Sequence, residues 1–325
     1  MTFFPVTQRT SRLWRCLVVC LCLLVVGGCA FVAIRFFHLP YHLECVFTRC
    51  GDEAKPLWGD ANAHVEPALG PDLNHLTVSI DRQPIIGVDQ NLSGLAYMAE
   101  TDQLVAVLNR PGTLLVLSTE GKLLRRHPLS GASDTEGVAY LGNNKVAVLQ
   151  EKKRTIVVLD LPQADGERID ASQALKYPLP MVKQRNSGPE GMGYDEQTDT
   201  LYVVKEKDSR GLYAVKGLMS GGPVVHEDLS HLLVGTEFAT DLSSVEFDPV
   251  GRHLLLLSDE AQTIFTLSLD GALLQSRSIN PDAGNGFTLP MPQPEGVAIG
   301  AHGRIYVVSE PNLFTVLVPT APIMP

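Results

Sequence analysis

The stretch QPEGVAIGAHGRIYVVSEPNLFTVL, residues 293–317, contains three short apolar runs separated by two turn sequences. The runs begin at residues 297, 305 and 313, and each has the length of a β-strand. Ala301-His302-Gly303 and Glu310-Pro311-Asn312 have the composition of tight turns. The stretch therefore predicts three antiparallel strands joined by short turns.

The same pattern occurs five times in the chain. The other copies occupy residues 91–117, 134–159, 188–215 and 241–267. We call the residue that opens the innermost strand of each copy its anchor, and the five anchors are Ser93, Glu136, Glu190, Ser243 and Glu295. Successive anchors are 43, 54, 53 and 52 residues apart, which is longer than the repeat of a leucine-rich or hexapeptide solenoid. Three strands plus a weaker fourth are the content of one propeller blade.

The weaker fourth strand is missing after the last copy. It is present after the first copy, at residues 122–129, and after the fourth, at 273–279. A suitable segment, residues 76–80, instead precedes the first copy, and we expect it to complete the last blade and remove an open sheet edge. Residues 75–319 therefore predict an all-β, five-bladed β-propeller closed by an N-terminal strand, with 49 residues per blade.

The N-terminal region predicts a membrane anchor. Residues 16–34 are 19 uncharged residues, long enough to cross a bilayer core as a helix. Three arginines precede this run, which predicts a cytoplasmic tail at 1–15, a single transmembrane helix at 16–35 in the inner membrane, and a propeller in the periplasm. A cleaved signal peptide and a lipoprotein signal at Cys29 are the alternatives. Proline-containing residues 36–74 predict a stalk, and 320–325 a short tail.

Charge and cysteine content exclude several classes of function. The formal net charge is −10, and it becomes −14 once the four arginines of the first 35 residues are set aside. Such an acidic domain is poorly suited to nucleic acid but suited to cations. Four of the six cysteines lie within 16–34, and Cys45 and Cys50 are a candidate disulfide. The repeats contain no cysteine, which excludes thiol catalysis and a cysteine zinc site there.

Two columns of acidic residues emerge when the copies are aligned. The second column closes the next strand, 15 or 16 residues after each anchor, at Asn109, Glu151, Glu206, Asp259 and Glu310. In an antiparallel hairpin the start of one strand lies beside the end of the next, so both columns should meet at one mouth of the propeller. Seven carboxylates are thereby predicted at that mouth: Glu136, Glu190, Glu295, Glu151, Glu206, Asp259 and Glu310. Asp134 and Asp241, two residues ahead of their anchors, are expected nearby.

Such a ring of carboxylates needs relief from repulsion. Two unit charges about 5 Å apart repel by roughly 3 kcal/mol at an effective dielectric constant near 20. Protonation, pairing with the lysines next to Glu151 and Glu206, or a bound cation would each relieve it. Glu136, Glu190 and Glu295 have no basic residue within two positions, so a hard cation fits them best, and calcium suits a wide ring better than magnesium. The structural alternative is that these glutamates accept backbone N–H bonds between blades.

Several of these motifs are those of a known family. They are Thr-Glu-Gly-Val-Ala-Tyr at 135–140, Pro-Glu-Gly-Met-Gly-Tyr at 189–194, Pro-Glu-Gly-Val-Ala at 294–298 and Ser-Glu-Pro-Asn-Leu-Phe at 309–314. Together with the N-terminal membrane anchor, these motifs resemble the SdiA-regulated family of bacterial envelope proteins, and the resemblance covers roughly residues 75–318. The resemblance implies a five-bladed propeller distantly similar to NHL repeats, with a calcium site and no established activity. Because Ser93 and Ser243 replace glutamate, we expect a lopsided site centred on Glu136, Glu190 and Glu295.

Two functions fit these features. The first is a calcium-stabilised binding module whose longer loops, at 163–187, 219–240 and 280–292, hold an unidentified small molecule or protein. The second is a metal-dependent hydrolase of lactonase or phosphoesterase type, which needs an open metal position and a general base. No histidine recurs at the predicted mouth, and no phosphate-binding loop, Gly-x-Ser-x-Gly or His-Glu-x-x-His motif occurs. These absences favour the binding module.

Overall fold

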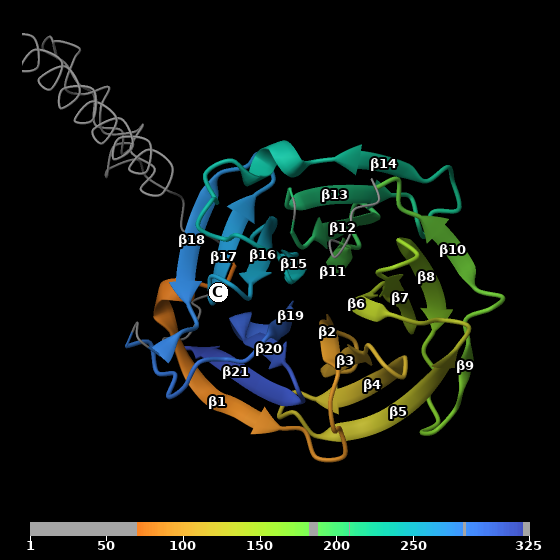
Figure 1. The fold of residues 1–325 in the computed structure, drawn as a ribbon, viewed down its shortest axis with the longest axis horizontal. Coiled ribbons are helices and arrows are strands. Elements are labelled where there is room, and N and C mark those ends of the chain that lie inside the picture. Colours follow the sequence, from red (N-terminus) through yellow and green to blue (C-terminus); the bar gives the residue numbers. More distant parts are fainter. Residues whose placement is uncertain (1–69, 182–187, 208, 282–283, 321–325) are drawn as a thin grey trace, which may run out of the picture. The chain divides into compact units, whose positions relative to one another are not determined.

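The computed structural model describes residues 70–181, 188–207, 209–281 and 284–320 of the chain. These residues form five antiparallel sheets arranged as the blades of a β-propeller (Figure 1), which confirms the predicted fold class. The innermost strands β2, β6, β11, β15 and β19 surround the centre, and each contacts the next around a closed ring.

Each blade is built outward from its innermost strand. Blade 1 contains β2 (Leu92–Met98), β3 (Gln103–Leu108), β4 (Thr113–Ser118), β5 (Leu123–Ser130) and the short β9 (Ile169–Asp170), which pairs in parallel with β5. Blade 2 contains β6 (Thr135–Tyr140), β7 (Lys145–Gln150), β8 (Thr155–Asp160) and β10 (Leu175–Pro178). Blade 3 contains β11 (Pro189–Asp195), β12 (Thr200–Lys205), β13 (Gly211–Lys216) and β14 (Val225–Asp228). Blade 4 contains β15 (Ser244–Asp248), β16 (His253–Ser258), β17 (Thr263–Ser268) and β18 (Leu273–Ser278).

Blade 5 joins the two ends of the propeller. It contains β19 (Pro294–Ile299), β20 (Ile305–Ser309), β21 (Leu313–Pro319) and, outermost, β1 (Leu76–Pro84). β1 pairs antiparallel with β21, from Leu76 opposite Pro319 to Pro84 opposite Leu313. The predicted closure by an N-terminal strand is therefore confirmed. Leu73, in the 3-10 turn before β1, is fully buried, so ordered packing begins slightly ahead of that strand.

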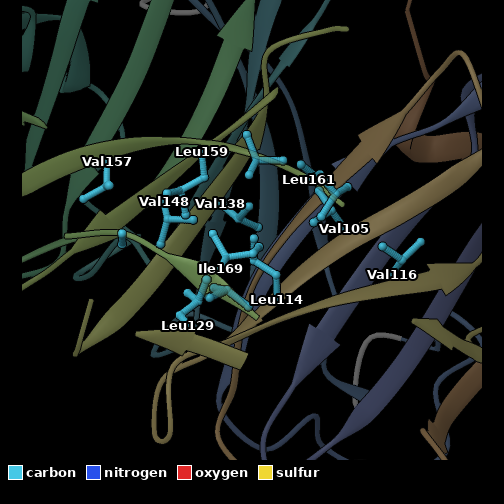
Figure 2. Packing of buried hydrophobic residues seen from close by; sticks show 14 of the residues in the cluster. Val105, Leu114, Val116, Leu129, Val138, Val148, Val157, Leu159, Leu161 and Ile169 are labelled. Atoms are coloured by element: carbon cyan, nitrogen blue, oxygen red, sulfur yellow. The ribbon is translucent and has the colours of Figure 1, made fainter. Parts of the chain in front are cut away.

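Hydrophobic side chains fill every gap between neighbouring blades. Val146 and Val148 of β7 pack into the cluster shared with blade 1, whereas Ala147 and Leu149 pack into the cluster shared with blade 3. This alternation follows from the two-residue period of a strand, which sends successive side chains to opposite faces of the sheet. Figure 2 shows the first of these clusters, in which Val105 and Leu114 of blade 1 meet Val138 and Val148 of blade 2. Both faces of most blades are thus buried.

The inner strands approach one another closely at the glycine that follows the anchor. A Cβ added to Gly94 would lie 2.7 Å from the Glu136 carbonyl oxygen, and one added to Gly137 would lie 2.7 Å from that of Glu190. At Gly191 it would lie 2.5 Å from Ser244 Cα. Separations under 3.0 Å cannot be held without moving a strand. Glycine is needed here for space between backbones.

The segments predicted as loops are partly strands. Residues 163–187 contain β9 and β10, and residues 219–240 contain β14 and a 3-10 turn at Ser230–Leu233. β14 is exposed along its whole length and β10 along most of it. An outermost strand with so little buried surface shows no alternation of apolar and polar residues, so its sequence resembles a loop.

The predicted transmembrane helix, the stalk up to residue 69 and the Cys45–Cys50 pair lie outside the described residues. Among the residues that the structure describes, no helix is long and apolar enough to cross a membrane. Membrane anchoring therefore stays a prediction.

Substituting Gly137 tests the close approach of the inner strands. Gly137→Ala should lower the free energy of unfolding by about 1–3 kcal/mol, because its Cβ would overlap the backbone of β11. Gly222→Ala is the matched control, since its Cβ would have no neighbour nearer than 3.9 Å and should change stability by less than about 0.5 kcal/mol. Chemical denaturation measures both. Equal stabilities of the two variants would contradict this account of the ring.

Candidate functional site

Four of the five anchors lie where the inner strands shift register, whereas β15 of blade 4 pairs with β16 without a shift. In β6 the pairing with β7 shifts between Thr135 and Val138, so that Glu136 lies in a β-bulge. Equivalent shifts occur at Ser93, Glu190 and Glu295. A bulge re-aims the side chain it contains and is common next to functional sites.

A repeated hydrogen bond holds the second column beside the first. The backbone N–H of Glu151 donates to the Asp134 carbonyl oxygen, that of Glu206 to Gly188 and that of Glu310 to Gln293, at 3.0–3.2 Å. In each blade the acceptor lies two residues before the anchor. Blade 4 replaces the carbonyl with a carboxylate, since the Asp259 N–H donates to Asp241 Oδ2 at 3.1 Å. The two columns therefore meet at the same end of the inner strands, as their spacing predicts.

A polar cavity of about 260 Å³ lies between the columns. Six of the seven predicted carboxylates line this acidic cavity, namely Glu136, Glu190, Glu206, Asp259, Glu295 and Glu310. Its other lining residues are Ser93, Asn109, Asp241, Ser243 and Gln293. Glu151 is not among them, although its charge still raises the pKa of Glu136 and Glu190. Histidine is absent from this lining.

Some of the acids already have partners. Lys207 Nζ lies 2.9 Å from Glu206 Oε1, and Asp241 accepts from Ser258 Oγ and from the N–H groups of the turn at residues 259–260. Lys152, expected beside Glu151, pairs with Asp134 at 2.7 Å instead, and Arg110 pairs with the same carboxylate. These contacts hold the rim of the mouth and leave its centre acidic.

The central carboxylates are poorly satisfied. Glu136 accepts from Ser93 Oγ at 2.8 Å and from Asn109 Nδ2. Among the described residues, no hydrogen bond or ion pair reaches the side chains of Glu190, Glu295 or Glu310, and no backbone N–H donates to the three anchor glutamates. The alternative of backbone bonds between blades is therefore not what the described residues show. Asn109 Oδ1 is also buried and without a partner.

Burial and mutual repulsion shift the titration of this cluster. Burial raises the pKa of Glu136 to about 7 and that of Glu295 to about 8, with neighbouring carboxylates adding to both. Burial, followed by repulsion from Glu136 and Glu151, raises the pKa of Glu190 well above its ordinary value. Part of the ring is thus protonated at neutral pH when no cation is bound.

The donor chemistry of the cavity fits calcium. Carboxylates, an amide oxygen without a partner and serine hydroxyls are the oxygen ligands that this ion prefers. In the part of the chain that the structure describes, however, no three His, Cys, Asp or Glu side chains stand close enough together to hold a metal ion. The cavity supplies suitable ligands without presenting them as a closed coordination shell.

A third column, two residues before the anchors, contributes to the site. The sequence pattern indicates only some of its members. Of the two aspartates expected nearby, Asp241 lines the cavity and Asp134 does not; Gln293, at the same position of the last copy, lines it as well. Extending that column through all five copies would have found it. Ser93 and Asn109 entered the columns only as departures from acid, yet they bind Glu136.

Comparison with known proteins identifies the family. The family model named SdiA-regulated matches residues 71–318, which is most of the chain. This protein belongs to the SdiA-regulated family. The match covers all five blades and the closing strand of this SdiA-regulated propeller.

Solved structures with a related fold are distant from this SdiA-regulated protein. A luciferin-regenerating enzyme is 12% identical with a TM-score of 0.47, over 74% of this chain and 95% of that one. A streptogramin B lyase is 11% identical with a TM-score of 0.43, over 76% and 99%. A chain of a nidogen/laminin complex is 13% identical with a TM-score of 0.45, over 68% and 73%. At such low sequence identities and TM-scores, the similarity supports no conclusion about ligand or activity.

The raised pKa values predict that the metal-free propeller loses stability as pH rises. A carboxyl group whose pKa is higher in the folded than in the unfolded state stabilises the fold below the unfolded pKa, near 4.5, and that contribution is lost as pH rises through the folded pKa. In chelator, stability should therefore fall between pH 5 and 8. Glu295→Gln should reduce that fall by on the order of 3 kcal/mol.

Urea denaturation across this pH range in chelator measures the effect. Glu167→Gln, which alters an exposed glutamate outside the cavity, is the control and should keep the parent's slope. A parent protein whose stability rises between pH 5 and 8, or a Glu295→Gln variant with an unchanged slope, would rule out the protonated ring.

Proposed function

We propose that this SdiA-regulated propeller is a binding module whose acidic cavity holds a calcium ion. The observation that carries the proposal is the set of oxygen atoms left without partners in the cavity. These belong to Glu190, Glu295 and Glu310 among the described carboxylates, and to the amide of Asn109. A cation there would supply what neither a lysine nor a backbone N–H supplies.

The ligands would come mainly from three blades. Glu136, Glu190 and Glu295 lie on the innermost strands of blades 2, 3 and 5 and influence one another's pKa. Ser93 and Ser243 supply neutral oxygens in blades 1 and 4. Because no closed group of ligands stands ready, binding requires these long side chains to turn inward, which repulsion opposes in the empty ring.

The same face of the propeller carries its longest connections. Each chain segment that enters an inner strand ends at the mouth, because the inner strand begins there. The segments that enter β15 and β19 are the long ones, and Phe238 and Leu289 within them are exposed. In a rigid scaffold such connections usually carry specificity, so we place the ligand of the module at this face.

Calcium should raise the melting temperature of the full chain. A ligand that binds only the folded state contributes about 2.7 kcal/mol at one hundred times its Kd, which corresponds to several degrees for a domain of this size. Magnesium should do less because it demands tighter octahedral geometry. Glu190→Gln or Glu295→Gln should abolish the calcium shift and raise the melting temperature in chelator, since glutamine is neutral without the cost of protonating or ionising a buried carboxyl group.

Differential scanning fluorimetry at pH 7.5 with calcium, magnesium or chelator measures these shifts, with Glu167→Gln as the control. A melting temperature indifferent to calcium in the parent protein would overturn the calcium site. A lower stability of the glutamine variants in chelator would show that the glutamates are structural hydrogen-bond acceptors.

A metal-dependent hydrolase is the second candidate, and one observation favours it. The pKa of Glu136, raised to about 7, is close to that of an effective general base at neutral pH. Against it, histidine does not line the acidic cavity. The carboxylate alone would have to activate water beside the metal.

A substrate screen separates the two functions. Lactones and phosphate esters incubated with the full chain in calcium should show no turnover above that of the Glu136→Gln variant if the protein is a binding module. Turnover that depends on calcium and falls by about a hundredfold or more in Glu136→Gln would establish the hydrolase instead. Product formation is followed by pH-indicator and phosphate-release assays.

A further inference from the structure

A second and larger cavity lies at the opposite end of the inner strands. It has a volume of about 580 Å³, within the range that holds small-molecule ligands. Its wall comes from the ends of β2, β15 and β19 and from the turns after them, and is mostly apolar: Tyr97, Ala99, Pro249, Val250, Ile299 and Ala301. This apolar cavity shares no lining residue with the acidic cavity.

One carboxylate interrupts the apolar wall. Asp248 lines the cavity although it is only 1% exposed, and its Oδ1 accepts from the Val250 N–H at 2.8 Å. Its Oδ2 has no hydrogen-bond partner. The imidazole of His253, itself 2% exposed, has its Nε2 3.5 Å from this oxygen, and that nitrogen also has no hydrogen-bond partner. A buried group left in this condition costs about 1–3 kcal/mol.

Glycines surround the unpaired oxygen. A Cβ on Gly70, which also lines the cavity, would lie 1.7 Å from Asp248 Oδ2, and one on Gly251 would lie 2.7 Å from it. A side chain at either position would cover the carboxylate or displace it. The two glycines therefore leave this oxygen next to the cavity, with the His253 ring as the side chain beside it.

We propose that the apolar cavity binds a small molecule with a flat apolar body and a positively charged nitrogen. Asp248 would accept a charge-assisted hydrogen bond from that nitrogen, which is stronger than a bond from a neutral donor. The body packs against Tyr97, Val250 and Ile299. Neither lysine nor arginine is among the described residues that line the cavity, whose ionisable groups besides Asp248 are His302 and the phenol of Tyr97. The proposal is independent of calcium at the acidic cavity.

Three probes that share a 2-naphthylethyl body and differ in the charge of the end group test the proposal on the full chain. They are 2-(2-naphthyl)ethylammonium, the corresponding alcohol 2-(2-naphthyl)ethanol, and 3-(2-naphthyl)propanoate, compared by isothermal titration calorimetry. The ammonium should bind about tenfold or more tightly than the alcohol, and the carboxylate more weakly than both. Equal binding of the three probes, or binding of none, would overturn the proposal.

Variants locate the binding. Asp248→Asn should remove the preference for the ammonium and keep the affinity for the alcohol. Asp270→Asn changes an exposed aspartate in the β17–β18 turn, at the same end of the blades, and should leave all three affinities unchanged. Ala99→Trp fills the cavity from its exposed rim and should weaken the ammonium and the alcohol alike.

The Ala99→Trp variant decides the matter if Asp248→Asn fails to fold, as judged by its melting curve. Ammonium binding that survives Ala99→Trp would place the probe elsewhere and overturn the proposal. A preference for the ammonium retained in a folded Asp248→Asn variant would do the same.

Discussion

The fold depends on how closely five inner strands can approach one axis. At the residue after the anchor, the backbone of one inner strand lies against that of the next, and Gly94, Gly137, Gly191 and Gly296 leave no room for a Cβ. Blade 4 alone has a residue with a side chain at this position. It is Ser244, whose Oγ accepts a hydrogen bond from the Val297 N–H at 3.2 Å. Residues of the same inner strands, such as Val138 and Met192, belong to the hydrophobic clusters between the blades, so the ring and the core are packed together.

This constraint also shapes the acidic mouth. The inner strand shifts register where the glycine packs, and the bulge exposes the preceding residue at the end of the propeller. A glutamate there is half-buried among other glutamates, which is costly for an empty ring. The acidic cavity therefore adjoins the closely packed glycines of the inner strands. Repulsion among its carboxylates acts directly on that ring of strands.

Much of this arrangement could be predicted from the sequence, because the repeat encodes it locally. The Glu-Gly pair, the 15- or 16-residue spacing and the unmatched strand at 76–80 determine blade number, closure and the meeting of both columns. Lys152 was harder to place, since either Glu151 or Asp134 is within reach of a long side chain and only the folded geometry favours Asp134. The outer strands β10 and β14 escaped detection because little of their surface is buried. The apolar cavity was invisible because its residues come from three distant turns.

Departures from the repeat are concentrated in one strand. Blade 4 has Ser243, just before β15, and Ser244, the first residue of β15, where three blades have Glu-Gly. β15 also has Glu246 where the other four inner strands have alanine or glycine. Burial raises the pKa of Glu246 well above its ordinary value, so this residue costs stability in a column that elsewhere is small and apolar. The chain around β15 also reaches both cavities, through Asp241 and Ser243 at one end and Asp248 at the other. When a repeat breaks its own packing rule without a gain in packing, function is the usual reason. The inner strand of blade 4 is accordingly the strand that departs most from the repeat, and it lies between the two cavities proposed to bind ligands.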